Sequence, residues 1–417
     1  MVPNSPLSRR AVLGVGGTVA AGGLAGSVLA TTGDAQSVQP GESTFSDWPL
    51  ERYDPAGTGY NPDVSGPGES VQVKWRTELN DFRGGRASPI LVDDTLYAVG
   101  AGVAALDARD GTVQYAVEGS YLSGPGVVPA EAYRSKTLVV AGSQGYVGLN
   151  SRGGATLLGR RFGFERWHQG GEPPSRFTIG ALPTASPPVV ADGVVYVADA
   201  VTDRLAALDP SSGRERWHTE VGHENASGQP GRPAVHDGTV YVGWWPQGAG
   251  AYDAQTGVQL WQQEVDGDIV FSPTAMDDRV LFPDPEGVTA LDPADGSELW
   301  RFDHAGNVTD DGAVAVADGT LFVVSDTEDR SLHAVDVTTG EERWRVPDVA
   351  REATPVVADG VVYLAADGFD VVAVDAGDGT VHWRFETENG AGTPAVSDGV
   401  LFVSGGYESV YALEAGR

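Results

Sequence analysis

The side chains that carry most enzyme chemistry are few in this chain and follow no catalytic or metal-binding spacing. It contains no cysteine, so disulfides, thiolate metal sites and thiol nucleophiles are excluded. No two of its seven histidines have the i, i+2 or i, i+4 spacing of a metal-binding pair. The phosphate-binding motif G-x-x-x-x-G-K-[ST], the serine elbow G-x-S-x-G and the zinc motif H-E-x-x-H are absent. We therefore predict no catalytic residue and no metal ligand set.

Charged side chains and one pair of adjacent indoles are the candidates for ligand binding. They stand in loops beside short apolar segments. If the fold is a ring of repeated units, as argued below, we expect these loops to converge at one opening of its central funnel. Charges of both signs around adjacent indoles suit a polar or sugar-like ligand or a protein segment, whereas solvated loop residues are the alternative interpretation. Asp284 and Glu286 could help to hold Ca²⁺, although no compact D-x-D-x-D loop supports this. The predicted binding residues are Arg86, Arg232, Trp244, Trp245, Asp268, Asp284, Asp310 and Glu352.

The chain is strongly acidic, with 58 Asp and Glu against 27 Lys and Arg and a formal charge of −31. Lys74 and Lys136 are its only lysines. This bias is similar to that of proteins from halophilic archaea, because molar salt shortens the Debye length to about 3 Å and screens repulsion among carboxylates. We expect a soluble surface and a fold that requires salt, and no nucleic acid partner.

A repeat of the form A-x-D-x-x-x-G-x-x-x-W organises most of the sequence. Two weaker copies precede five complete ones, and a half copy ends the chain, which gives eight units at intervals of mostly 39 to 44 residues. The complete copies contain Asp209, Gly213, Trp217; Asp253, Gly257, Trp261; Asp292, Gly296, Trp300; Asp336, Gly340, Trp344; and Asp375, Gly379, Trp383. The weaker copies are read as Asp107, Gly111, Tyr115 and as Asn150, Gly154, Leu158, and the half copy ends at Glu414.

Each unit contains four strand signals joined by turn residues. In the clearest copy, the pair Asp192-Gly193 separates two apolar strands and favours a type I′ hairpin turn. Equivalent pairs begin at Asp237, Asp318, Asp359 and Asp398. The repeated Asp and Gly are therefore assigned to turns, not to catalysis. We predict an all-β, eight-bladed propeller of four-stranded antiparallel blades, a ring of the type that WD40-like repeats also form.

The two ends of the chain are predicted to share one blade. The last unit has three strands and lacks the fourth, which carries the Trp, whereas "SVQVKWRTEL" near the start contains Trp75 followed by Arg76, as Trp300 is followed by Arg301. We expect this N-terminal strand to close the last blade, which removes exposed sheet edges. A longer interval after Asn150 predicts a protruding insertion over residues 160–185, either functional or merely tolerated.

The N-terminus has the pattern of an export signal. Arg9-Arg10 precede a Gly- and Ala-rich apolar run that ends near Ala30, as in a twin-arginine signal peptide. A retained membrane anchor is the alternative, because the run is nearly long enough to span. We therefore divide the chain into a signal peptide (1–30), a lead-in segment (31–70) and the propeller (71–417), and expect a secreted or cell-surface protein that is monomeric.

These repeats resemble those of the pyrroloquinoline quinone (PQQ)-like propeller family. The resemblance covers roughly residues 45–417, including "DWPLERYDPAGTGYNP" from Asp47 to Pro62, and implies that each outer-strand Trp packs between neighbouring blades. The family contains quinone-dependent dehydrogenases, with the quinone and Ca²⁺ in a central funnel, and cofactor-free propellers such as the outer-membrane barrel-assembly lipoprotein. Fold follows from this resemblance, but function does not.

The missing cysteines favour the second group. The family's dehydrogenases typically hold the quinone beneath a disulfide of adjacent cysteines, which this chain cannot form. They are also usually longer, with insertions that build the funnel walls. We therefore expect no cofactor and a protein-binding or envelope scaffold. The alternative is a PQQ-dependent alcohol or sugar dehydrogenase with quinone and calcium in the funnel.

Overall fold

The computed structural model describes residues 43–79, 87–119, 121, 123–142, 145–157, 160–170, 186–199, 202–222, 230–266, 270–304, 313–325, 330–349, 354–366, 370–388, 390–406 and 409–417. Two compact units are distinguished, Met1–Glu42 and Ser43–Arg417, and the second contains every described residue. All regular elements in the described ranges are β-strands, which confirms the all-β prediction. Within these ranges, no helix has the length and apolar character needed to cross a membrane.

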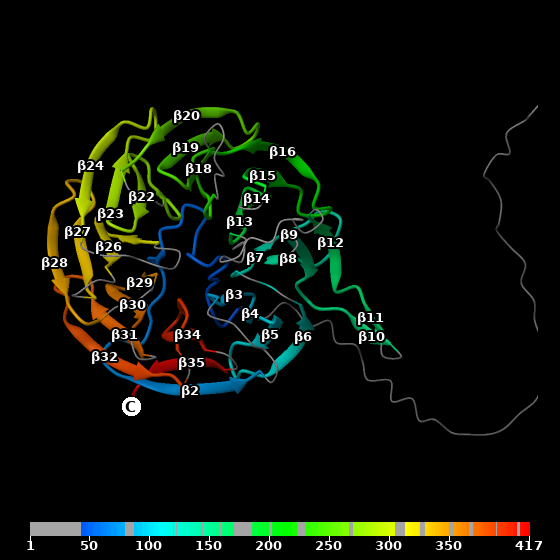
Figure 1. Ribbon diagram of the computed structural model, residues 1–417. Helices are drawn as coiled ribbons and strands as arrows, with labels where there is room; N and C mark the ends of the chain where they lie inside the picture. The colour runs from blue at the N-terminus through cyan, green and yellow to red at the C-terminus, as the bar shows by residue number, and fades with distance from the viewer. Residues whose placement is uncertain are drawn as a thin grey trace, which may run out of the picture. The chain divides into compact units, whose positions relative to one another are not determined.

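Eight four-stranded antiparallel blades surround a common centre, as predicted (Figure 1). Blades 1 to 4 consist of β3 (Ile90–Val92), β4 (Thr95–Gly100), β5 (Gly102–Asp107), β6 (Val113–Glu118); β7 (Gly126–Val128), β8 (Thr137–Gly142), β9 (Gly145–Asn150), β12 (Glu165–Gln169); β13 (Val189–Ala191), β14 (Val194–Asp199), β15 (Arg204–Leu208), β16 (Glu215–Glu220); and β17 (Ala234–His236), β18 (Thr239–Trp244), β19 (Gly248–Asp253), β20 (Gln259–Glu264). Blades 5 to 8 consist of β21 (Thr274–Ala275), β22 (Val280–Asp284), β23 (Gly287–Leu291), β24 (Glu298–Asp303); β25 (Ala315–Ala317), β26 (Thr320–Val324), β27 (Leu332–Asp336), β28 (Glu342–Val346); β29 (Val356–Ala358), β30 (Val361–Ala365), β31 (Asp370–Asp375), β32 (Val381–Glu386); and β33 (Ala395–Ser397), β34 (Val400–Gly405), β35 (Ser409–Ala415), β2 (Val71–Glu78).

The hairpin turns between the first two strands of the blades have the predicted type I′ backbone. Asp192 has φ 49° and Gly193 has φ 70°, so both central residues are left-handed. The four equivalent Asp-Gly pairs, which begin at Asp237, Asp318, Asp359 and Asp398, also combine two positive φ angles.

The repeat motif joins each blade to the next. Trp217 on β16 donates its indole N–H to the Ala254 carbonyl of blade 4 at 2.9 Å, and its ring lies on Gly257, where an added Cβ would be 2.5 Å from it. The same indole-to-carbonyl bond is made by Trp75, Trp261, Trp300 and Trp383. Because the tryptophans seal the gaps between blades, hydrophobic clusters run from one blade into its neighbour.

The N-terminal strand closes the last blade, as predicted. β2 pairs antiparallel with β35, with Trp75 opposite Ala412 and Arg76 opposite Tyr411. Figure 1 shows this contact between the blue and red ends of the ribbon. The closed ring therefore leaves no blade of fewer than four strands among the described residues.

The assignment of Gly154 and Leu158 to the motif of blade 2 is wrong. The Trp position belongs to Trp167 on β12, which donates to the Pro210 carbonyl at 2.9 Å, and the Gly position belongs to Gly153, against which Tyr115 packs. A hairpin of β10 (Ala155–Leu157) and β11 (Arg160–Phe162) is inserted between turn and outer strand. It projects from the ring (Figure 1), and the Trp is displaced along the sequence because of it.

Candidate functional site

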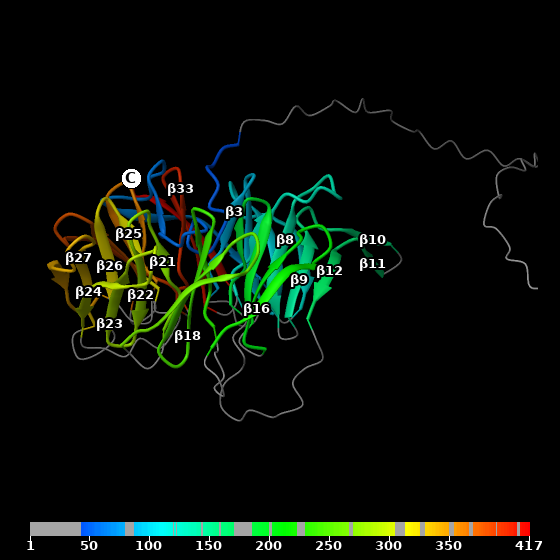
Figure 2. The same ribbon diagram turned by 90° about the horizontal axis from the view of Figure 1, so that it is seen from above.

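The lead-in segment occupies the middle of the ring. Six residues between Trp48 and Ser65 make seven backbone hydrogen bonds to residues at or beside the inner strands of blades 1, 4, 5, 6, 7 and 8, at 2.7 to 3.0 Å. Its strand β1 (Tyr60–Asn61) pairs parallel with β29 at the inner edge of blade 7. In Figure 2 this blue segment lies over β3 and β33, along one face of the ring. The chain itself thus fills this part of the centre.

Arg52 extends from the lead-in segment between blades 5 and 6. It is 1% exposed, and it donates to the carbonyls of Pro273 at 3.1 Å and Val314 at 2.5 Å and to the Thr274 hydroxyl at 2.5 Å. These partners lie at or just before the inner strands β21 and β25. A buried guanidinium with several carbonyl partners fixes the relative positions of two blades and the lead-in segment.

Arg232, a predicted ligand-binding residue, lies beside Arg52 and not at an open mouth. It is 1% exposed and donates to the Asp54 carbonyl at 3.1 Å. A Cβ placed on Gly57 would be 2.9 Å from its Nη1 and 3.0 Å from the Nη1 of Arg52, so both guanidinium groups flank this glycine. Two buried guanidinium groups therefore lie side by side in this part of the ring.

The described residues provide no site for the Ca²⁺ that accompanies the quinone in the family's dehydrogenases. Ca²⁺ needs six to eight oxygen ligands, usually with several carboxylates. Where the structure describes the chain, no three Asp, Glu or His side chains converge to hold a metal ion. Two guanidinium groups at the centre would repel a divalent cation.

Asp284, another predicted binding residue, is part of an ion pair inside blade 5. It is 2% exposed, and Arg301 of the outer strand β24 donates to its Oδ2 at 2.7 Å and to the Thr289 hydroxyl at 2.8 Å. Although burial lowers the pKa of Arg301, the hydrogen bonds that it donates to Asp284 and Asp303 raise it above its ordinary value. Asp284 therefore neutralises Arg301 two strands away, and hydrogen bonds already engage both of its oxygens.

The indole pair is divided between core and surface. Trp244 is fully buried, and its ring occupies the space left by Gly248 and Gly250 on the paired strand β19. Trp245 is 41% exposed in the turn that follows β18. Of the described candidates, Trp245 alone presents a large side chain to solvent.

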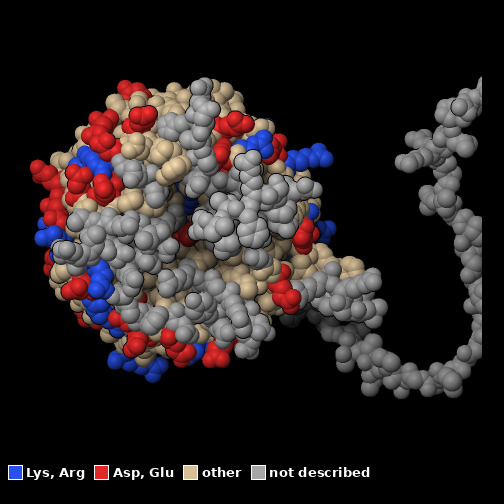
Figure 3. Space-filling view, in the orientation of Figure 1, with Lys and Arg blue, Asp and Glu red and all other residues tan. Residues whose placement is uncertain are grey.

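The other four predicted binding residues cannot be placed. Arg86, Asp268, Asp310 and Glu352 lie outside the described residues. Figure 3 shows that acidic side chains, with basic ones among them, are spread around the rim of the visible face and do not form one patch. The negative charge therefore marks no site on this face.

Arg52 is the residue that sequence reasoning did not identify. It stands in "DWPLERYDPAGTGYNP", a segment that the family resemblance covered without assigning roles. The only signal was an arginine in a Gly- and Pro-rich stretch, and this does not distinguish a buried guanidinium from a solvated one.

The solved structures that resemble the fold have different activities. BamB from Moraxella catarrhalis matches with a TM-score of 0.61 at 15% identity, covering 82% of this chain and 99% of that one. The quinohemoprotein alcohol dehydrogenase ADHIIG from Pseudomonas putida HK5 matches with a TM-score of 0.69 at 14% identity, covering 91% and 81%. At these identities, the likeness shows the fold alone.

Curated relatives match parts of the chain. The serine/threonine-protein kinase AfsK of Streptomyces coelicolor is 32% identical over 165 residues, which are 38% of this chain and 18% of the kinase. The outer membrane protein assembly factor BamB of Burkholderia pseudomallei is 26% identical over 297 residues, 66% of this chain and 69% of that protein. Several others are matched over only 21% to 51% of their length.

A family model covers nearly all of the propeller. The model described as "Outer membrane protein assembly factor BamB", built on PQQ-like repeats, matches residues 68–197, 156–271, 223–287 and 284–417. These matches contain every complete copy of the repeat motif and the strand that closes the ring. The chain therefore belongs to the BamB-like family of PQQ-repeat propellers.

Proposed function

We propose that this protein is a non-enzymatic, extracytoplasmic scaffold that binds protein partners on the outside of a rigid ring. The observation that carries the proposal is the lead-in segment in the middle of the ring, with Arg52 buried between blades 5 and 6. This segment ties the inner strands of six blades together, which makes the ring rigid. Recognition is then left to the outer strands and loops.

The family supports an assembly role outside the cytoplasm. The matching family model and several relatives have the name outer membrane protein assembly factor, and the paired arginines near the N-terminus favour export by the twin-arginine route. We propose that the mature protein is a secreted or cell-surface monomer, adapted to high salt, and that its partner is a protein of the cell envelope.

Photo-crosslinking in the native cells tests this function. A photoreactive phenylalanine analogue replaces one exposed side chain at a time: Trp245 in a blade-4 turn, Phe162 on the inserted hairpin, or Leu260 on an outer strand, which are 41%, 53% and 55% exposed. We expect discrete protein adducts from at least one position. The analogue at buried Trp244 is the control and should give none. If no exposed position gave an adduct, the scaffold function would be contradicted.

A PQQ-dependent alcohol or sugar dehydrogenase is the second candidate, favoured by 31% identity over 171 residues to a 1-butanol dehydrogenase (quinone) of Thauera butanivorans. The purified chain is incubated with PQQ and Ca²⁺ at high salt, separated from free quinone, and assayed for bound chromophore and for dye reduction with alcohols and aldoses. We expect neither stoichiometric chromophore nor turnover. Stoichiometric chromophore together with turnover would show that the protein is a dehydrogenase and would contradict the scaffold function.

A further inference from the structure

The eight blades allow one outer strand to be compared with seven others in the same chain. In every blade a β-bulge interrupts the outer strand at the residue before its Trp or Tyr. We call this residue the bulge residue. In blades 1 to 8 the bulge residues are Gln114, Arg166, Arg216, Leu260, Leu299, Arg343, His382 and Lys74.

In most blades the bulge residue is basic and contacts the turn residue of its own blade's repeat motif. Arg343 lies 2.7 Å from Asp336 and Arg216 lies 3.4 Å from Asp209. The equivalent contacts are His382–Asp375 at 3.6 Å, Lys74–Glu414 at 3.5 Å and Arg166–Asn150 at 3.2 Å. In blade 1, Arg109 pairs with the turn residue Asp107 instead. The repeated turn carboxylate thus normally has a basic partner.

Blades 4 and 5 break this rule together. Their bulge residues are Leu260 and Leu299, which are 55% and 45% exposed, and Val258 before Leu260 is 61% exposed. We call these three side chains the apolar strip. Throughout the described residues no Lys, Arg or His pairs with the turn carboxylates Asp253 and Asp292. Two neighbouring blades therefore combine exposed leucines with turn carboxylates that lack a basic partner among the described residues.

The outer strand of blade 4 lies against the motif turn of blade 5. Trp261, next to Leu260, donates to the Pro293 carbonyl of blade 5 at 2.9 Å, and Gln263 donates to the Asp295 carbonyl at 3.3 Å. These contacts place β20 against the turn that leads into β24 and Leu299. Figure 1 shows the two strands as neighbours on the rim.

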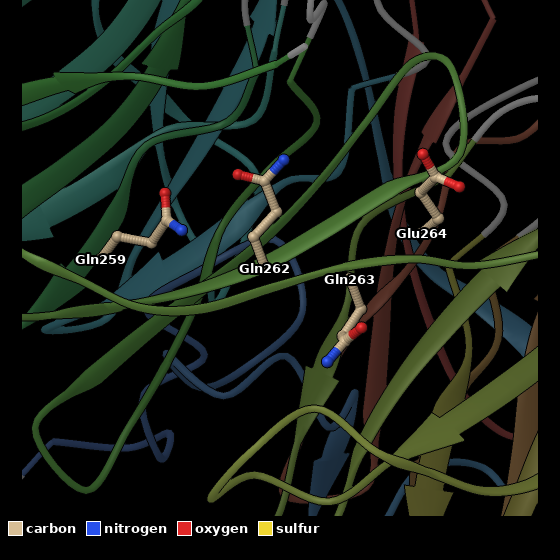
Figure 4. A pocket seen from close by; sticks show the side chains of 4 residues that line it. All are labelled: Gln259, Gln262, Gln263 and Glu264. Carbon is tan, nitrogen blue, oxygen red and sulfur yellow. The ribbon is translucent and has the colours of Figure 1, made fainter.

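β20 carries a single charge, Glu264, at its exposed sheet edge. It reads Gln-Leu-Trp-Gln-Gln-Glu and is the last strand of its sheet, whereas β16, β28 and β32 each contain Arg. Edge strands usually carry charge because unpaired N–H and C=O groups otherwise accept another strand. Gln259, Gln262, Gln263 and Glu264 line a shallow hollow of about 440 Å³ on this strand, and Figure 4 shows their side chains. Their amides can both donate and accept hydrogen bonds.

We propose that β20 and the apolar strip bind an extended segment of a partner protein that alternates apolar and basic side chains. Such a segment would add as a strand to the open edge, place its apolar groups on Leu260 and Leu299, and supply the positive charge that Asp253 and Asp292 lack. A second copy of this chain is disfavoured as the occupant because its formal charge is −31. The inference rests on the proposed scaffold function and names the chemistry of the partner.

The binding test uses the full chain and a labelled peptide of alternating Val and Arg, followed by fluorescence anisotropy. A peptide with Glu in place of Arg is the probe control. The double variant Leu260→Arg, Leu299→Arg copies the bulge residues of other blades, so we expect it to fold normally. It should weaken binding of the Arg peptide at least about tenfold. Val113→Arg, at a 41% exposed position of blade 1, adds the same kind of charge elsewhere and should leave binding within about twofold.

Three results would overturn the inference: no binding of the Arg peptide, equal binding of the Glu peptide, or equal binding to the double variant. A dimer of the unaltered chain that the double variant abolishes would instead assign the strip to a second copy, and would also overturn it. Crosslinked adducts from Trp245 or Phe162 but none from Leu260 would refute this surface and leave the scaffold function standing. Failure of the scaffold function itself is recognised by the loss of adducts from every position.

Discussion

His304 is a titratable side chain that the fold buries between blades 5 and 6. It is 7% exposed, and its ring stacks on that of His333 with centroids 5.9 Å apart and an interplanar angle of 20°. Among the described residues, neither ring nitrogen has a hydrogen-bond partner. Burial lowers the pKa of His304 to about 4, and the nearby His333 and Arg301 contribute in the same direction. The ring is therefore neutral in the folded protein.

This histidine predicts a loss of stability in weak acid. The folded pKa lies below the unfolded value of 6.5, so the unfolded chain binds more protons between these values. The contribution is full above pH 6.5 and is lost as the pH falls toward 4. From about pH 7.5 to about pH 5 it amounts to about 2 kcal/mol of unfolding free energy. The free energy is measured by denaturant titration at both pH values and constant salt.

His304→Phe keeps a ring in the stack and removes the titrating group. The difference in unfolding free energy between the two pH values should shrink by about 2 kcal/mol in this variant. Any packing change cancels, because it acts at both pH values. An equal pH response of the unaltered chain and His304→Phe would show that this histidine is not the cause.

Two glycines of blade 4 separate the effect of backbone conformation from that of packing. Gly257 has φ 71° and Gly238 has φ 73°, so Ala is strained to a similar extent at both positions. An added Cβ at Gly257 would be 2.5 Å from Trp217, whereas nothing lies within 4 Å of one at Gly238. We expect Gly238→Ala to cost about 1 kcal/mol of unfolding free energy and Gly257→Ala about 3 kcal/mol. Equal losses in denaturant titrations would mean that the Trp does not pack on the glycine.

At the scale of the element, the repeat motif predicted more than individual residues did. The type of turn, the order of the strands and the placement of β2 as the outer strand of blade 8 all follow from local patterns that recur in the chain. The predicted binding residues were harder to place, because the exposure of a charged loop residue depends on which other segments pack against it. Arg232 contacts the lead-in segment and Asp284 contacts Arg301 of β24. Neither partner can be predicted from the residues next to Arg232 or Asp284 in the sequence.

Blade 2 shows where a repeat misleads. The spacing of the motif placed Leu158 on the outer strand. Because the hairpin is inserted before that strand, the strand comes later in the sequence and contains Trp167. A signal was present: "ERWH" at Glu165 repeats the "ERWH" at Glu215, which lies on the outer strand of blade 3. Similarity of the strand itself identifies it better than its distance from the turn.

The inserted hairpin should be removable. Deleting residues 155–163 restores between Asn150 and Trp167 the spacing that separates Asp209 from Trp217. The hairpin forms a separate two-stranded sheet, whereas β12 completes blade 2, so we expect the thermal midpoint to change by no more than about 3 °C. Trp167→Ala is the contrasting variant and should lower it much further, because it removes a buried indole and its bond to Pro210. A collapse of the deletion variant would mean that the hairpin supports the blade.

At the scale of the whole molecule, the N-terminal part of the propeller has two separate tasks. Residues 43–69 link the inner strands of six blades through backbone hydrogen bonds. β2 then supplies the outer strand of blade 8, and Trp75 donates from it to the Ala108 carbonyl of blade 1 at 2.9 Å. The first task ties the blades at the centre, and the second closes the ring at its rim.

Stepwise truncation separates these tasks. The reference chain begins at Ser43, a second begins at Ser70, and a third begins at Thr77. The second loses the central ties and the Asp54 carbonyl that Arg232 contacts, so its thermal midpoint should fall by several degrees. The third also loses most of β2 and the closure by Trp75, which exposes the edge of β35 and should cause aggregation or a non-cooperative transition.

Circular dichroism melts and size-exclusion chromatography at high salt measure both effects. If the second and third chains behaved alike, closure by β2 would contribute nothing; if the second matched the reference, the central segment would be dispensable, and the observation behind the scaffold function would lose its force.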